Sequence, residues 1–356
     1  MKSFIKKRNN LLAKKLKQLI NEFKKLHSSK IDLDFYQSYF FLEIFMNLHH
    51  KLSSQISDIK EYYNLIDKYI LAIKNFRKIS KNFGFEKKIL SNKKLIKDIQ
   101  NREYYGMLFN NFSNFHYYDE PYLLLKKRLK INNIDLKSLK GKSLLDYGCG
   151  AGRYTQAFAK LGCKNILGVD FSHNNIQTAK KKNKFKSLVS YKIANVNKNR
   201  LKSNSFEYIF CNGVLHHTGN ILKGLKEIRR ILKPGGKCII YLSSTDGIKW
   251  YFIEAFREIV KDYNKAKFAK HLRIFNLKYS KIFYLMDHIF VKYNDLTTKS
   301  EVENLFLSAN LKIVQKLARG HHLDDTERYF QLRKKRSKKI AFDIYGFGEH
   351  RYIISK

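Results

Sequence analysis

Three glycines at alternate positions follow a short apolar run that ends in an aspartate. Residues 144–152 read Leu-Leu-Asp-Tyr-Gly-Cys-Gly-Ala-Gly, and the next stretch is compatible with a helix. A strand that enters a helix through Gly148, Gly150 and Gly152 brings backbone N–H groups and the positive end of the helix dipole up to a ligand. The spacing is G-x-G-x-G and not the G-x-G-x-x-G of the dinucleotide-binding fingerprint.

A second carboxylate stands at the end of the next apolar run. Asp170 directly follows Ile-Leu-Gly-Val at 166–169. A carboxylate at this place can accept hydrogen bonds from both hydroxyl groups of a ribose. The glycine turn and this carboxylate together predict a site for a ligand that contains a nucleoside.

The region around these residues resembles the core of a class I S-adenosylmethionine (SAM)-dependent methyltransferase, over residues 143–244. Four motifs carry the resemblance: Leu-Asp-Tyr-Gly-Cys-Gly-Ala-Gly-Arg at 145–153, Gly-Val-Asp-Phe-Ser at 168–172, Phe-Glu-Tyr-Ile-Phe-Cys-Asn-Gly-Val-Leu-His-His at 206–217 and Leu-Lys-Pro-Gly-Gly-Lys at 232–237. Their order, with helix-length gaps between them, is what distinguishes the family from a chance match to one motif.

The elements that must position these residues alternate between short apolar runs and helical stretches, which is the pattern of a parallel α/β sheet. We predict strands near 143–147, 165–170, 188–193, 206–212, 236–243, 311–318 and 350–355, and helices near 152–162, 173–183, 220–232 and 298–309. The resemblance implies a Rossmann-like α/β fold with a seven-stranded, mostly parallel sheet whose last strand is antiparallel.

The sequence also predicts regions outside this core. Residues 1–100 are expected to be a helical N-terminal region, 101–141 an aromatic-rich leader or lid, and 142–356 the methyltransferase domain, with a substrate-side insertion at 245–297. In the first region, apolar residues recur at steps of three and four: Ile5, Leu12, Leu16, Leu19, Phe23 and Leu26. Such a stripe can lie on a membrane, but burial against neighbouring helices is favoured.

The resemblance assigns cofactor contacts to individual residues. Asp146 would accept a hydrogen bond from the ammonium group of SAM, Asp170 would hold the ribose, and Asn195 would face the adenine amino group. Asn212 and Gly213 would line the pocket near the sulfur. The implied cofactor-binding set is Asp146, Gly148, Cys149, Gly150, Gly152, Asp170, Phe171, Asn195, Asn212 and Gly213.

Two histidines follow the fourth predicted strand. His216 or His217 could take a proton from an acceptor hydroxyl, although His217 could instead pack against the cofactor or cap the next helix. Regions that build acceptor pockets in related enzymes contain Trp250, Tyr251, Asp287, His288 and Arg319. The cluster His321, His322, Asp324 and Asp325 matches no standard zinc spacing, so we expect no metal site.

Composition sets further limits. The formal net charge is +41, yet 56 of the 71 basic residues are Lys and they are spread along the chain. Lys, Asn and Ile have A/T-rich codons, so genome bias is favoured over nucleic-acid binding as the origin of this charge. Four cysteines without a C-x-x-C pair are typical of reduced thiols, so we expect a cytoplasmic protein. No stretch is apolar enough to span a bilayer.

These observations favour a SAM-dependent methyltransferase that acts on a small or medium-sized metabolite, with O-methylation as the favoured reaction. The first alternative is an RNA methyltransferase that uses the basic N-terminal region, although residues 212–215, Asn-Gly-Val-Leu, lack the Asn/Asp-Pro-Pro-Tyr/Phe motif of exocyclic amino methylation. The second alternative is a non-catalytic SAM-binding assembly subunit.

Overall fold

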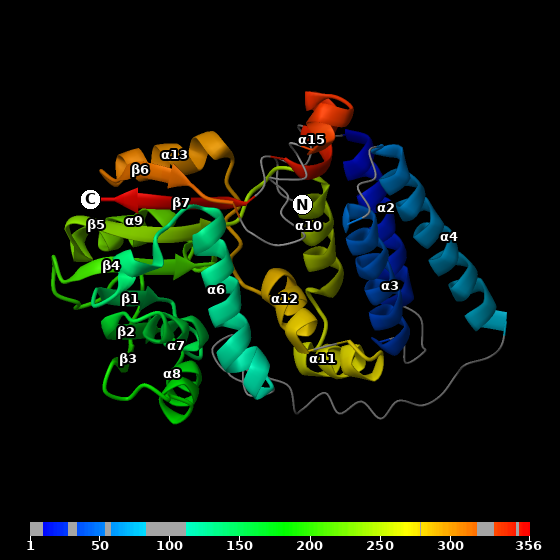
Figure 1. Ribbon diagram of the computed structural model, residues 1–356. Helices are drawn as coiled ribbons and strands as arrows, with labels where there is room; N and C mark the ends of the chain where they lie inside the picture. Colours follow the sequence, from blue (N-terminus) through cyan, green and yellow to red (C-terminus); the bar gives the residue numbers. More distant parts are fainter. Residues whose placement is uncertain are drawn as a thin grey trace. The chain divides into compact units, whose positions relative to one another are not determined.

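The chain forms two compact units, a helical unit and a sheet unit (Figure 1). The computed structural model describes residues 10–27, 34–53, 58–82, 112–277, 279–318, 331–346 and 349–356. The helical unit comprises the described parts of 1–98, 246–291 and 328–346, and the sheet unit those of 99–245, 292–327 and 347–356.

The sheet unit is built on a seven-stranded sheet in the order β3-β2-β1-β4-β5-β7-β6, which can be followed in Figure 1. Its strands are β1 (Ser143–Tyr147), β2 (Lys164–Asp170), β3 (Val189–Ile193), β4 (Phe206–Asn212), β5 (Leu232–Leu242), β6 (Lys312–Lys316) and β7 (His350–Ser355). Strand β7 runs antiparallel to both neighbours, β5 and β6. The predicted Rossmann-like class, with an antiparallel last strand, is confirmed.

Helices cover both faces of this sheet, and the alternation of side chains along the strands separates two apolar cores. Leu144 of β1 belongs to the core on one face, with Phe158 of α7, whereas Leu145 belongs to the core on the other face, with Leu225 of α9. This period of two is what a strand buried on both faces requires. The helical elements are η1 (Phe115–Asp119), α6 (Glu120–Ile131), η2 (Leu136–Leu139), α7 (Arg153–Lys160), α8 (His173–Lys181), η3 (Leu215–His217), α9 (Ile221–Ile231) and α13 (Lys299–Ser308).

The predicted elements of the sheet unit agree with the observed ones closely, except at the start of β5. The strand was expected from Gly236, the last residue of the Pro-Gly-Gly turn at 234–236, but it begins at Leu232. Leu232 pairs with Phe206 before the register shifts, so pairing starts upstream of the turn residues. The helix α9 accordingly ends at Ile231.

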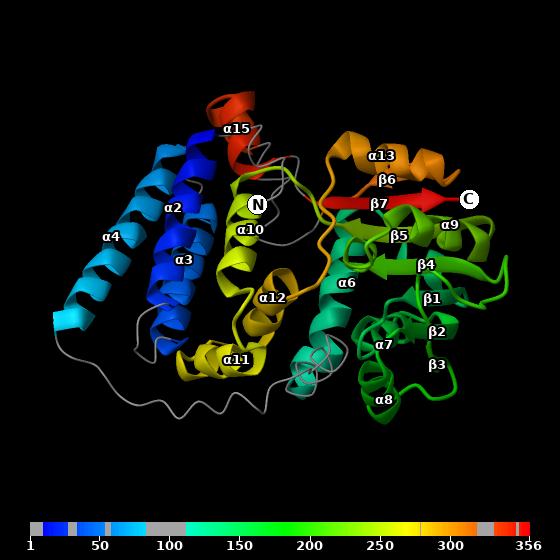
Figure 2. The same cartoon turned by 180° about the vertical axis from the view of Figure 1, so that it is seen from behind.

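The helical unit combines the N-terminal helices with the insertion that follows β5. It contains α2 (Asn10–His27), α3 (Asp34–Ser53), α4 (Lys60–Asn82), α10 (Ile248–Val260), α11 (Lys265–Ile274), α12 (Tyr279–Ile289) and α15 (Lys338–Tyr345). Helices α2, α3 and α4 lie side by side, α10 packs on α2, and α11 packs on α3 (Figure 2).

The apolar stripe of α2 is buried in this unit. Leu12, Leu16, Leu19, Phe23 and Leu26 are each at most 2% exposed, as packing between helices requires. The favoured interpretation of the stripe is therefore confirmed for the described positions, while Ile5 lies outside them. None of the described helices has the length and apolar character needed to cross a bilayer.

The division into an N-terminal region, a leader and a methyltransferase domain stays a prediction. Residues 83–111, which contain the predicted boundary between residues 100 and 101 and the start of the leader, lie outside the described residues. The described part of the leader, from Phe112, belongs to the sheet unit.

Helix α13 offers a test of local stability, because it begins with a capping box. The Thr298 hydroxyl accepts from the Glu301 N–H at 3.2 Å, and the Thr298 N–H donates to the Glu301 carboxylate at 2.7 Å. We expect Thr298→Ala to lower the free energy of unfolding by about 1 kcal/mol. Thr298→Ser should retain most of the wild-type free energy of unfolding, because its hydroxyl can accept the same hydrogen bond. Urea unfolding followed by circular dichroism measures both, and equal losses in the two variants would contradict the capping role.

Candidate functional site

The glycine turn after β1 adopts a backbone conformation that side chains disfavour. Gly148, Gly150 and Gly152 have φ angles of +84°, +54° and +84°. A Cβ atom at Gly148 would lie 2.5 Å from Val214, and one at Gly152 would lie 2.5 Å from the hydroxyl of Tyr191. Glycine is therefore required at these two positions both by conformation and by space.

Asp170, at the end of β2, binds this turn directly. One carboxylate oxygen accepts from the Gly150 N–H at 3.0 Å, and the other accepts from the Ser172 N–H at 2.9 Å and the Asn175 side chain at 3.2 Å. The side chain is buried. Burial raises the pKa of Asp170, while these three hydrogen bonds act in the opposite direction.

Asp146, at the end of β1, is the second buried carboxylate. One of its oxygens accepts from the Thr155 hydroxyl at 2.5 Å. Burial raises the pKa of Asp146 to about 7, and the neighbouring charge of Asp170 acts in the same direction. Two buried acidic groups beside one turn favour a positively charged ligand, because a cation stabilises both ionised forms.

The aromatic leader is anchored on the glycine turn. The Tyr117 hydroxyl donates to the carbonyl of Ala151. Arg153, the first residue of α7, donates to the His116 carbonyl at 2.9 Å and to the Glu120 carboxylate at 2.7 Å. The sequence predicts an aromatic-rich leader or lid over 101–141, but no spacing in it identifies Tyr117 or Arg153 as the contacts.

The two histidines after β4 differ in environment. His216 is 2% exposed, and its Nδ1 accepts from the Ser243 N–H at 3.2 Å. His217 is half-buried, and its Nδ1 lies 2.9 Å from the Tyr293 carbonyl. A carbonyl only accepts, so Nδ1 of His217 carries the proton and Nε2 of the neutral ring is the basic nitrogen.

The remaining predicted cofactor residues occupy the same edge of the sheet. Asn212 ends β4, and its side-chain oxygen accepts from Arg351 at 3.0 Å; Gly213 follows it with a φ of +79°. Phe171 is 46% exposed.

Asn195 is exposed and its side-chain oxygen accepts from the Asn197 N–H at 2.8 Å, so this oxygen already takes part in a local turn. The thiol of Cys149 belongs to the glycine turn, and burial raises its pKa.

The predicted acceptor residues on α10 and α12 belong to the helical unit. Trp250, Tyr251 and His288 are buried there, and the rings of Trp250 and His288 stack with centroids 5.9 Å apart. Asp287, beside His288 on α12, is partly exposed. Arg319 and the cluster His321, His322, Asp324 and Asp325 lie outside the described residues.

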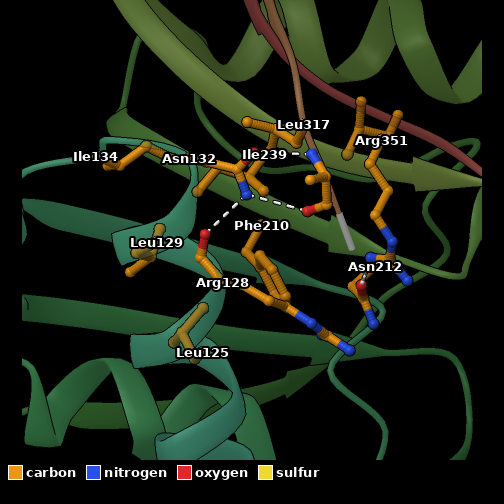
Figure 3. A pocket seen from close by; sticks show the side chains of 12 residues that line it. Leu125, Arg128, Leu129, Asn132, Ile134, Phe210, Asn212, Ile239, Leu317 and Arg351 are labelled. Atoms are coloured by element: carbon orange, nitrogen blue, oxygen red, sulfur yellow. Dashed lines mark hydrogen bonds between the residues drawn. The ribbon is translucent and has the colours of Figure 1, made fainter. Parts of the chain in front are cut away.

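A small cavity opens beside Asn212 within the sheet unit (Figure 3). Its volume is about 30 Å³, which is room for one water molecule. The residues that line it are Leu125, Arg128, Leu129, Asn132, Ile134, Phe210, Asn212, Ile239, Ile240, Leu317, Ala318 and Arg351. The cavity was not predicted, because its walls come from segments far apart in the sequence.

Comparisons with known proteins match the part of the chain that contains the glycine turn and the two carboxylates. A family model described as a methyltransferase domain matches residues 145–240. An uncharacterized protein of Methanocaldococcus jannaschii is 32% identical over 188 residues, which cover 52% of this chain and 74% of that protein.

Two relatives with named activities match shorter stretches. A tRNA U34 carboxymethyltransferase of Nautilia profundicola is 30% identical over 158 residues, covering 40% of this chain and 52% of the relative. A malonyl-[acyl-carrier protein] O-methyltransferase of Buchnera aphidicola is 31% identical over 126 residues, covering 35% of this chain and 49% of the relative. The chain thus spans about half the length of both.

The pKa of Asp146 predicts how pH affects the stability of the ligand-free protein. In the unfolded chain this carboxyl has its ordinary pKa of 3.8, and in the folded protein about 7. Between these values the folded state holds a proton that the unfolded state has lost, so rising pH favours unfolding. The contribution is at most about 1.4 kcal/mol per pH unit.

Asp146→Asn should remove this dependence while an amide oxygen still accepts from Thr155. Urea unfolding of wild type and variant at several pH values between 4 and 8 measures the difference. We expect the variant to gain stability relative to wild type as pH rises. A difference that stays constant with pH would show that Asp146 ionises normally in the folded protein.

Proposed function

Since the chain belongs to the class I SAM-dependent methyltransferases, we propose that it transfers a methyl group to an oxygen atom of a small or medium-sized metabolite. The observation that carries the proposal is the pair of buried carboxylates, Asp146 and Asp170, on either side of a glycine turn at the carboxyl edge of the sheet. When bound, SAM supplies a methyl group that is activated by a positively charged sulfur.

The residues present suit this cofactor. SAM carries an ammonium and a sulfonium group, and the site offers two acidic groups in low-dielectric surroundings. Asp146 would accept from the ammonium group, and Asp170, already bound by three donors, would accept from a ribose hydroxyl with its remaining lone pair, which is on the oxygen that Gly150 binds. The glycines would let the backbone of the turn come close to the ligand.

His217 is the better candidate for the general base. Its proton on Nδ1 is fixed by the Tyr293 carbonyl, which leaves Nε2 to receive a proton from an acceptor hydroxyl. His216 is buried, and its Nδ1 is already engaged by the Ser243 N–H. Beyond this proton transfer, catalysis requires mainly that the two reactants be held in line.

Oxygen is proposed as the accepting atom for two reasons. After β4 the chain reads Asn212-Gly213-Val214, which lacks the proline pair of enzymes that methylate exocyclic amino groups. A malonyl-[acyl-carrier protein] O-methyltransferase is also among the relatives. Demonstrating the activity requires incubation with SAM and a panel of phenols, catechols and carboxylic acids, with S-adenosylhomocysteine as the measured product.

An RNA substrate is the second candidate, because a tRNA U34 carboxymethyltransferase is also a relative and the net charge is +41. Binding through many lysines would release counterions, so affinity for tRNA would fall steeply with added salt. Salt-dependent tRNA binding together with methyl transfer to tRNA would favour this candidate over the metabolite.

Asp170→Ala should abolish detectable SAM binding in calorimetry, because it removes the ribose acceptor and also releases the Gly150 N–H that orders the turn. Asp262→Ala, at an exposed position after α10, is the matched control and should bind SAM as wild type does. Near-wild-type affinity of Asp170→Ala would overturn the ribose assignment.

His217→Ala should lower turnover about 100-fold with any hydroxyl acceptor that wild type methylates, in keeping with the usual contribution of a general base. SAM affinity should stay unchanged, since the proton transfer concerns the acceptor. Rates of S-adenosylhomocysteine formation and calorimetry separate the two effects. Unchanged turnover would remove His217 as the base.

A further inference from the structure

Three side chains form a row across the carboxyl edge of the sheet. Asn212 of β4 pairs with Tyr241 of β5, and Tyr241 pairs with Arg351 of β7. Because directly paired residues project to the same face, the three side chains share one surface. The guanidinium of Arg351 lies over the Tyr241 ring, 4.0 Å from its centroid, and reaches across it to Asn212.

Arg351 is held firmly in this position. It is 9% exposed, and its Nε and Nη2 bind the buried carboxylate of Glu349 at 3.0 and 2.9 Å. Its Nη1 donates to Asn212. An arginine stacked on a ring and bound to a carboxylate through two N–H groups has little freedom to move.

This arrangement fixes which way the amide of Asn212 faces. A guanidinium only donates, so the amide oxygen must be the atom that faces Arg351. The amide N–H₂ group is therefore the end that remains for another partner. Among the described residues, none accepts a hydrogen bond from this nitrogen. The cavity that Asn212 lines has room for one water molecule, and therefore for the oxygen atom of an acceptor but not for its ring (Figure 3).

The surroundings of Asn212 are rich in donors. None of the residues that line the cavity is acidic, and two of them, Arg128 and Arg351, are cationic. Figure 3 shows the Arg128 side chain extending toward Asn212 from α6. The charge of Arg351 is balanced by the buried carboxylate of Glu349, so the net positive charge here comes from Arg128. A positive charge beside the donors favours a ligand oxygen with partial or full negative charge over an ammonium group.

We propose that the amide N–H₂ of Asn212, oriented by Arg351, binds the attacking oxygen of an acceptor whose hydroxyl ionises, such as a phenol. This inference rests on the proposed function and narrows its substrate class. Arg351 is a positioning residue here, because it acts through Asn212. An acceptor that attacks through an amine nitrogen would instead need a side-chain oxygen, and the amide oxygen of Asn212 is turned toward Arg351, which takes one of its two lone pairs.

The test uses 4-nitrophenol, whose phenol and phenolate forms differ in colour, with the complex of the full chain and S-adenosylhomocysteine. In wild type, bound 4-nitrophenol should ionise about one pH unit lower than free 4-nitrophenol, a roughly tenfold preference for the phenolate. Asn212→Ala should abolish this shift. Asn212→Asp, which replaces the N–H₂ by a charged oxygen, should reverse its direction.

Arg351→Met tests the positioning role. Without Arg351 the amide of Asn212 can rotate, so we expect the pKa of bound 4-nitrophenol to fall by less than it does in wild type. Since loss of Arg351 leaves Glu349 buried without its cation, Arg351→Met combined with Glu349→Gln is the second variant. Asn75→Ala, at an exposed position on α4, is the control and should behave as wild type.

The outcomes separate this inference from the proposed function. Failure of wild type to bind S-adenosylhomocysteine in calorimetry would overturn the proposed function. Normal binding of S-adenosylhomocysteine with no colour shift of 4-nitrophenol, or with the same shift in wild type and both Asn212 variants, would overturn the Asn212 assignment alone. An unchanged shift in both Arg351 variants would overturn the positioning role.

Discussion

The site depends on one buried carboxylate that joins two strand ends. Asp170 leaves water when the chain folds, and an ionised carboxylate in that position is stable only if donors replace its hydration. Gly150, Ser172 and Asn175 supply three such donors, and one of them is the backbone of the glycine turn itself. The turn after β1 is thereby fixed relative to the end of β2.

The sign of the charge at this site is opposite to that of the whole chain. The formal net charge is +41, yet the two groups that flank the glycine turn, Asp146 and Asp170, are acidic. The excess of lysine therefore says nothing about the ligand that the turn holds. Overall charge governs long-range attraction, whereas a buried pair of carboxylates selects its ligand at contact distance.

The strands of the sheet were predictable because each one is marked by its own residues and by those directly beside it in the sequence. Apolar runs such as 166–169 are short, end in polar residues and alternate with helical stretches, so each strand of the sheet unit could be placed to within a few residues. The early start of β5 was missed because it depends on pairing with Phe206, which turn-forming residues do not reveal.

Contacts between distant segments were not predictable in this way. The apolar stripe of α2 indicates a buried face, but it does not identify α10, more than 200 residues later, as a neighbour. Trp250 of α10 and His288 of α12 are a second example, because nothing in the sequence reveals that their rings stack on each other within the helical unit.

The antiparallel direction of β7 explains how Arg351 reaches the site. The parallel strands bring their last residues to the carboxyl edge, where open α/β sheets bind ligands. A strand that runs the other way brings its first residues there, and Arg351 is the second residue of β7. In a fully parallel sheet the same position would lie at the opposite edge. The inverted strand thus lets a residue near the end of the chain control the orientation of Asn212, 139 positions earlier.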